Sequence, residues 1–307
     1  ELARSQPLMR RTATAFAPAT VGNAAVGFDL LGHAVISVGD ATLRFELSGR
    51  GQTVVFVHGW ANTLAVWDEQ VPAFAQRYQV LRYDGRGFGR STGFADVSAD
   101  PDDLRILLDS LGIASAYVVG LSAGSDVATR FAFAFPRRTL ALVRLSGAPP
   151  QGMPGPPPRA RENRERLAHI LRTYGMDSLH TFVLAQPGFV PPDETQAERS
   201  KRLERQAKGW DYDGRDLLDP RPQSGRVPAV PWERIRELAV PALLVNGAHD
   251  GARQLMVADS LAKYLPNVRK VVIQRAGHAA NLSQPAHFNT ALLEFFASVS
   301  KRASSGS

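Results

Sequence analysis

The stretch AYVVGLSAG, residues 116–124, decides the fold that the sequence predicts. Its first part is apolar up to Leu121, as expected for a strand buried on both faces of a parallel sheet. Further along the chain, apolar residues recur at helical spacing, at Ala128, Phe131, Ala132 and Phe135. The two glycines and the serine between them therefore lie where a strand passes directly into a helix.

A serine at such a junction is a candidate nucleophile. The pattern G-x-S-x-G between a strand and a helix is typical of a nucleophile elbow. Its turn is so sharp that the flanking positions need glycine. The turn also lifts the Ser122 hydroxyl to a helix N-terminus, where backbone N–H groups favour negative charge. The alternative, in which Ser122 only caps the helix, is disfavoured by the strand–turn–helix context.

Strands and helices alternate over much of this 307-residue chain, which is 44% hydrophobic and 21% charged. Residues 41–49 alternate apolar and polar positions, as in an early antiparallel strand. Apolar runs typical of buried strands follow at residues 53–59, 78–84, 140–148, 241–250 and 269–278. We therefore expect an α/β fold with a mostly parallel central sheet that helices cover on both faces.

The alternation is interrupted once. The proline- and glycine-rich stretch PPQGMPGPPP, residues 149–158, is typical of a hinge, and the residues up to about 231 are polar and helical. We predict a core in two halves, residues 37–148 and 236–300. A helical cap at residues 149–235 separates them, and a disordered tail occupies residues 301–307.

A serine hydroxyl needs a base, and the base needs a carboxylate that fixes its tautomer. Of the seven histidines, His278 follows the last predicted strand in a glycine-marked loop, RAGHAAN. Asp250 ends the strand before it and gives the chain order Ser, acid, His. Residues 139–150 hold no Asp or Glu, which excludes an acid one strand earlier. We expect Asp84 to hold a tight turn and His58 to shape a loop.

Acyl transfer also needs donors for the developing oxyanion. The backbone N–H of Ala123, directly after Ser122, is one candidate, and that of Trp60, after the strand at 53–59, is the other. In the cap, Phe182, Phe189 and Trp210 are candidates for an apolar substrate pocket, with ordinary core packing as the alternative.

Five motifs then appear in order over most of the chain: HGW (58–60), YDGRGFGRS (83–91), GLSAGS (120–125), NGAHD (246–250) and AGHAANLSQP (276–285). From about Thr42 to Phe296 the chain resembles α/β-hydrolase-fold enzymes of the esterase, lactonase and perhydrolase group. The resemblance implies Ser122, Asp250 and His278 as catalytic residues, no cofactor, and a small-molecule ester or lactone as substrate. A C–C bond hydrolase or perhydrolase would use the same triad. A non-catalytic ligand-binding protein on this fold is the alternative of another class.

The opening stretch FAPATVGNAAVGFDLLG, residues 16–32, resembles the start of homoserine kinase, where Asn23 and Asp29 match substrate-holding positions. The glycine- and serine-rich phosphate loop of that family is missing. About twenty residues cannot form a kinase core. We therefore interpret residues 1–36 as a fused fragment, natural or engineered, that extends the sheet edge or covers part of the surface.

Composition limits the remaining function classes. The chain has no cysteine, which excludes disulfides, thiolate metal sites and a cysteine nucleophile, and no metal site is predicted. The net charge of +7 is spread along the chain without a nucleic-acid motif, so we expect no nucleic-acid partner. We expect no membrane partner because no apolar run is long enough to span a bilayer. Arg10 and Arg11 precede a polar stretch, which favours a cytoplasmic protein over an exported one. The oligomeric state stays open.

Overall fold

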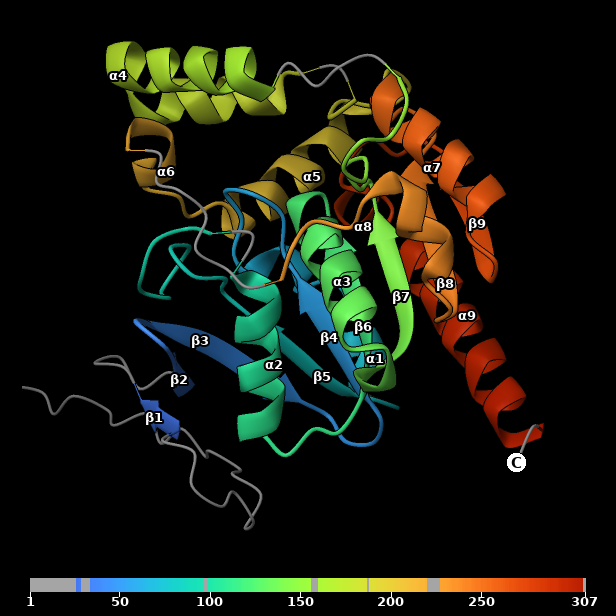
Figure 1. Cartoon of the computed structure of the whole chain (residues 1–307). Coiled ribbons are helices and arrows are strands. Elements are labelled where there is room, and N and C mark those ends of the chain that lie inside the picture. The colour runs from blue at the N-terminus through green and yellow to red at the C-terminus, as the bar shows by residue number, and fades with distance from the viewer. Residues whose placement is uncertain are drawn as a thin grey trace, which may run out of the picture.

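The computed structural model describes residues 26–28, 34–96, 99–155, 160–186, 188–219 and 227–305. In these ranges nine strands form one sheet in the order β1-β2-β3-β5-β4-β6-β7-β8-β9 (Figure 1). The strands are β1 Val26–Phe28, β2 Ala34–Val38, β3 Ala41–Ser48, β4 Thr53–Val57, β5 Gln79–Tyr83, β6 Ala116–Leu121, β7 Thr139–Leu145, β8 Ala242–Gly247 and β9 Val268–Ile273.

The sheet is antiparallel at one edge and parallel elsewhere. β1, β2, β3 and β5 pair antiparallel in turn, whereas every pair from β5 to β9 in the sheet order is parallel. Parallel neighbours require crossover connections, which the helices between the strands supply. The predicted α/β class with a mostly parallel sheet is confirmed.

Helices connect most of the strands and cover both faces of the sheet. They are α1 Val71–Phe74, α2 Asp100–Ser110, α3 Ala123–Ala134, α4 Ala160–Leu184, α5 Gln196–Gly209, α6 Arg215–Leu218, α7 Ala252–Tyr264, α8 Ala280–Ser283 and α9 Pro285–Ser305. Short 3-10 helices occur at η1 Leu64–Trp67, η2 Pro136–Arg138 and η3 Trp232–Glu237. No helix in the described ranges combines the length and apolar character needed to cross a membrane.

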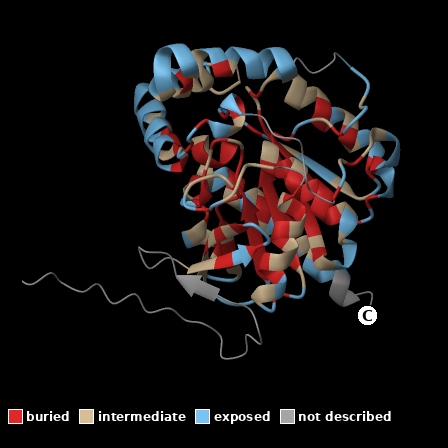
Figure 2. Cartoon of the chain, turned by 60° about the vertical axis from the view of Figure 1, so that its left-hand side comes forward, coloured by how far each residue is buried: buried red, intermediate tan, exposed pale blue. Residues whose placement is uncertain are grey.

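Two hydrophobic clusters lie on the two faces of the sheet. On one face Leu104 of α2 and Val127 of α3 join the cluster around Val55, and on the other Phe74 of α1 and Phe288 of α9 join another. All of these side chains are buried, and Figure 2 shows the buried residues concentrated in the sheet and the helices against it. Each large apolar side chain buried in this way contributes roughly 1.5–3 kcal/mol to the stability of the fold. The sheet therefore holds the loops at its edge in fixed positions.

The helices α4, α5 and α6 lie in the chain between β7 and β8, within the stretch 149–235. Figure 1 shows them above the end of the sheet to which β7 points, which is the carboxyl end of the parallel strands. Most of α4 is exposed. Its path breaks at Gly175, where φ is 79°.

Both ends of the chain differ from the predicted boundaries. β2 crosses the boundary between residues 36 and 37 because Ile36 and Val38 are both buried in the core. α9 runs to Ser305, which corrects the disordered tail predicted from residue 301. Lys301 and Arg302 are good helix formers, and cationic side chains near a helix C-terminus are favourable. Apart from β1, the kinase-like stretch 16–32 lies outside the described residues.

Candidate active site

Ser122 occupies the turn between β6 and α3. Its φ is 53° and its ψ is −114°, a conformation that costs an L-residue about 1–3 kcal/mol. A Cβ on Gly120 would lie 2.1 Å from the Gly124 carbonyl oxygen, and a Cβ on Gly124 would lie 2.4 Å from that of His58. The two glycines are therefore required by the close approach of strand, turn and helix. This is the strained turn that the GLSAG pattern predicts.

Hydrogen bonds hold the turn in place. The Ser122 N–H donates to the Leu145 carbonyl at 2.8 Å. The buried Ser125 hydroxyl donates to the Gly120 carbonyl at 2.6 Å. Sequence reasoning missed Ser125, although its place three residues after the nucleophile position was visible in the motif.

The loop after β4 passes next to Ser122. A Cβ on Gly59 would lie 3.3 Å from the Ser122 Cβ. Both ring nitrogens of buried His58 bind backbone: Nε2 accepts from the Gly85 N–H at 2.8 Å, which leaves Nδ1 to donate to the Gly59 carbonyl at 2.7 Å. Burial lowers the pKa of His58, in keeping with a neutral ring. These bonds confirm the loop-shaping role expected for His58.

The two residues predicted to supply oxyanion donors lie near Ser122: Ala123 follows it in the chain, and Trp60 lines the same cavity. Ala123 is the first residue of α3, so its N–H has no carbonyl partner within the helix. Trp60 belongs to the Gly59 loop. Its indole N–H donates to Asp216 Oδ2 at 3.2 Å, and its ring packs against Tyr212 with 4.8 Å between centroids. The inserted helices thus fix the loop that would carry the second donor.

His278 and Asp250 form a buried pair. His278 Nδ1 lies 3.0 Å from Asp250 Oδ1, and the Asp250 carboxylate also accepts hydrogen bonds from Asn246 Nδ2 and the Gly251 N–H, each at 2.8 Å. Burial alone would raise the pKa of Asp250, but the hydrogen bonds and the attraction to His278 leave it below its usual value. The charged carboxylate is therefore the stable form, and it holds the His278 ring in one orientation. Sequence reasoning missed Asn246, whose only signal was its place in the NGAHD motif.

A loop of the inserted region packs against the His278–Asp250 pair and holds it in place. The Gly188 carbonyl accepts from the His278 N–H at 2.6 Å, and the Phe189 ring lies 4.7 Å from the His278 ring. Gly188 has a φ of 97°, and a Cβ there would lie 2.6 Å from the Gly251 nitrogen. Gly188 therefore fits between the loops that carry Asp250 and His278, a contact that no sequence motif indicates.

Replacing Gly188 with alanine should lower both stability and activity. The left-handed φ and the collision with Gly251 together should cost about 2–4 kcal/mol of unfolding free energy. Displacement of His278 should lower kcat by up to about 100-fold. Urea unfolding and ester hydrolysis measure the two effects.

Gly112→Ala is the matched control, because Gly112 has a φ of 65° with nothing near its Cβ position. It should cost only the backbone strain of about 1–2 kcal/mol and leave kcat unchanged. Equal effects of the two substitutions on kcat would contradict a positioning role for Gly188.

Ser122 and His278 line one small cavity of about 80 Å³. Trp60, Phe189 and Trp210 also line it, together with Val183 and Leu184 of α4. The structure thus brings most of the predicted site residues to one chamber, with Asp250 behind His278. Ala123 lines a larger neighbouring cavity.

Phe182 is not among the residues that line the chamber. Its ring lies 4.6 Å from the Arg166 guanidinium carbon. In one straight helix, sixteen residues would span about 24 Å. The contact therefore requires α4 to fold back at Gly175, and this fold turns Phe182 toward Arg166 while Val183 and Leu184 face the chamber. Within the described ranges, no group of three or more His, Asp or Glu side chains is placed to hold a metal ion.

The fold is that of the α/β hydrolases. A family model described as alpha/beta hydrolase fold matches residues 52–285, and the chain belongs to that family. The Azorhizobium caulinodans protein named "Putative carbamate hydrolase RutD" is 29% identical over 268 residues, which cover 84% of this chain and 96% of the relative.

Solved structures agree with the family. A thermophilic esterase from Thermogutta terrifontis is 26% identical, with a TM-score of 0.71 over 84% of this chain and 94% of its own. An enol-lactonase from Burkholderia xenovorans LB400, 23% identical with a TM-score of 0.68, covers 86% and 99% and shows the shared fold. The prediction of an esterase-like α/β hydrolase is confirmed at the family level. The resemblance of residues 16–32 to homoserine kinase finds no support in these matches.

Proposed function

We propose that the chain is a serine hydrolase that cleaves carboxylic esters or lactones through an acyl-enzyme on Ser122. The single observation that carries the proposal is the chamber shared by Ser122 and His278, with the buried Asp250 carboxylate bonded to His278 Nδ1. Because Asp250 engages Nδ1, Nε2 is the nitrogen left to exchange a proton with the serine hydroxyl.

In the proposed reaction His278 Nε2 takes the Ser122 proton as the hydroxyl oxygen attacks the substrate carbonyl carbon. The backbone N–H groups of Trp60 and Ala123 stabilise the oxyanion. His278 then protonates the leaving alcohol, and the carbonyl reforms as an ester on Ser122. A water, deprotonated by His278, attacks this ester, releases the acid and restores the serine.

Residues 149–235 act in this proposal as a cap. Phe189, Trp210 and Val183 supply apolar walls beside the nucleophile, and a chamber of about 80 Å³ favours a short acyl or alcohol group at the reacting carbon. The relatives named as an esterase, an enol-lactonase and a carbamate hydrolase support acyl transfer to water as the reaction class.

A panel of p-nitrophenyl esters from acetate to decanoate tests the function. We expect p-nitrophenol release to be fastest for short acyl groups, and a fluorophosphonate probe to modify the peptide that contains Ser122 in a 1:1 ratio and to stop turnover. The same panel of esters, assayed with added hydrogen peroxide as a nucleophile that competes with water, measures perhydrolysis. No turnover and no adduct at Ser122 would favour a non-catalytic ligand-binding protein.

A further inference from the structure

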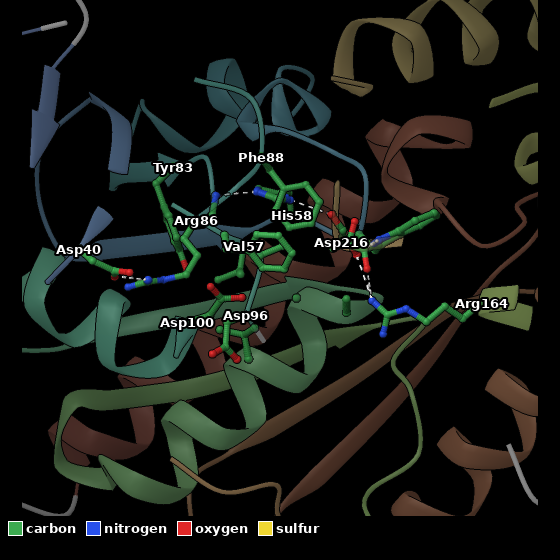
Figure 3. A pocket seen from close by; sticks show the side chains of 18 residues that line it. Asp40, Val57, His58, Tyr83, Arg86, Phe88, Asp96, Asp100, Arg164 and Asp216 are labelled. Carbon is green, nitrogen blue, oxygen red and sulfur yellow. Dashed lines mark hydrogen bonds and ion pairs between the residues drawn. The ribbon is translucent and has the colours of Figure 1, made fainter. Parts of the chain in front are cut away.

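A second and larger cavity, of about 490 Å³, lies next to the nucleophile chamber. The two share Gly59 and Trp60 as walls, and the larger one also reaches Ala123 and Gly124 at the start of α3. Figure 3 shows its side chains, which come from the ends of β4 and β5, from α2 and from the inserted helices. A ligand group bound there would contact the same Gly59–Trp60 loop that lines the Ser122 chamber.

The charged residues that line this cavity are mainly acidic, although the protein as a whole is basic. Four aspartates and two arginines line it, in a chain with a net charge of +7. Both arginines are already engaged. Arg86 binds Asp103 and Asp40, each at 2.7 Å, and Arg164 lies 3.9 Å from Asp216. The cavity therefore has more carboxyl groups than arginines, and no described residue donates a hydrogen bond to the Asp100 side chain.

A second polar group faces the same space. The Tyr83 side chain is only 1% exposed, lines the cavity, and has no hydrogen-bond partner for its hydroxyl among the described residues. In Figure 3 Tyr83 and Asp100 point into one part of the cavity. Burial raises the pKa of Tyr83 and of Asp100, the latter also through the neighbouring Asp103. Buried polar groups are normally paired. Among the described residues neither the Tyr83 hydroxyl nor the Asp100 carboxyl has a hydrogen-bond donor or acceptor opposite it, and a ligand can supply one.

We propose that this cavity binds a primary ammonium group, carried on an arm of the ester or lactone substrate. An ammonium has three donors, enough for the Asp100 carboxylate and the Tyr83 hydroxyl oxygen, and its charge offsets the acidic excess. Trp60, Phe88 and Phe94 also line the cavity, and such aromatic rings attract cations. The proposal rests on the proposed function only where it assigns the ammonium to the substrate.

Calorimetry with hexylammonium chloride tests the site without any turnover, and 1-hexanol is the neutral probe. We expect wild type to bind hexylammonium at least about 10-fold more tightly than 1-hexanol. Asp100→Asn should weaken hexylammonium binding by about 10- to 100-fold, and Tyr83→Phe should weaken it by a smaller factor. Asp102→Asn is the matched control on the first turn of α2. Asp102 forms an ion pair with Arg105 and does not line the cavity, so the substitution should leave binding unchanged.

Thermal unfolding separates a binding role from a structural one. Asp100→Asn and Tyr83→Phe change groups that have no side-chain hydrogen-bond partner among the described residues, so the Tm of each variant should be equal to or above that of wild type. A marked fall in Tm together with unchanged hexylammonium binding would overturn the assignment.

The substrate half of the proposal needs a pair of isosteric esters, ethyl 6-aminohexanoate and ethyl heptanoate. Wild type should hydrolyse the amine with the higher kcat/KM, Asp100→Asn should reverse the preference, and hexylammonium should compete with the amine ester. If hexylammonium binding depends on Asp100 but the enzyme does not prefer the amino ester over ethyl heptanoate, the assignment of the ammonium to the substrate is overturned, whereas the ammonium site itself is supported. Loss of all ester turnover would instead contradict the hydrolase proposal, while calorimetry would still decide the site.

Discussion

Ser122→Ala should lower ester turnover by about 10⁶-fold, the loss seen when a comparable triad loses its nucleophile. The residual rate would come from binding and from the oxyanion donors alone. KM should change little, because the hydroxyl contributes to bond formation more than to ground-state binding. Initial rates with the fastest p-nitrophenyl ester of the panel measure the effect.

The control is Ser200→Ala, which removes an exposed hydroxyl on α5 and should leave kcat unchanged. Ser122→Gly adds a stability test. It removes the nucleophile and also relieves a φ of 53°, so its unfolding free energy should exceed that of wild type by about 1 kcal/mol. Turnover by Ser122→Ala within tenfold of wild type would rule out an acyl-enzyme on this residue.

The sheet and the elbow could be predicted because their signals are local. The apolar run before Gly120 and the helical spacing after Gly124 specify a strand and a helix, and the glycines specify the turn between them. Asp250 and His278 could be predicted for a related reason. Each follows a strand, and the carboxyl ends of parallel strands meet at one edge of the sheet.

The inserted region could not be predicted at the same level because its contacts are long-range. The close contact between Gly188 and Gly251 joins residues more than sixty positions apart, and nothing in the local sequence indicates it. The fold of α4 at Gly175 likewise decides that Val183 rather than Phe182 reaches the chamber. The same holds for Tyr83 and Asp100. In the sequence they are the last residue of a strand and the first of a helix, and only the tertiary structure brings them to one cavity.

Asp250→Asn should lower kcat by about 10⁴-fold while leaving the shape of the site almost unchanged. An asparagine amide can donate to His278 Nδ1, which would favour the tautomer with its proton on Nε2. That tautomer cannot accept the Ser122 proton. The amide also cannot stabilise the imidazolium that forms during attack. Rates with the same p-nitrophenyl ester, and far-UV circular dichroism to verify the fold, measure the outcome.

Asp259→Asn is a suitable control, because Asp259 is an exposed carboxylate paired with Lys270, and its kcat should match wild type. The pH dependence of stability gives an independent check on Asp250. Its pKa is below the ordinary value of 3.8 in the folded protein, so its charge stabilises the fold above that pH and ceases to do so as pH falls through the folded pKa. Wild type should therefore be more stable than Asp250→Asn at pH 7, and the difference should shrink in acid below about pH 4. A difference that grows on acidification, or a kcat within tenfold of wild type, would mean that Asp250 is not the charged partner of His278.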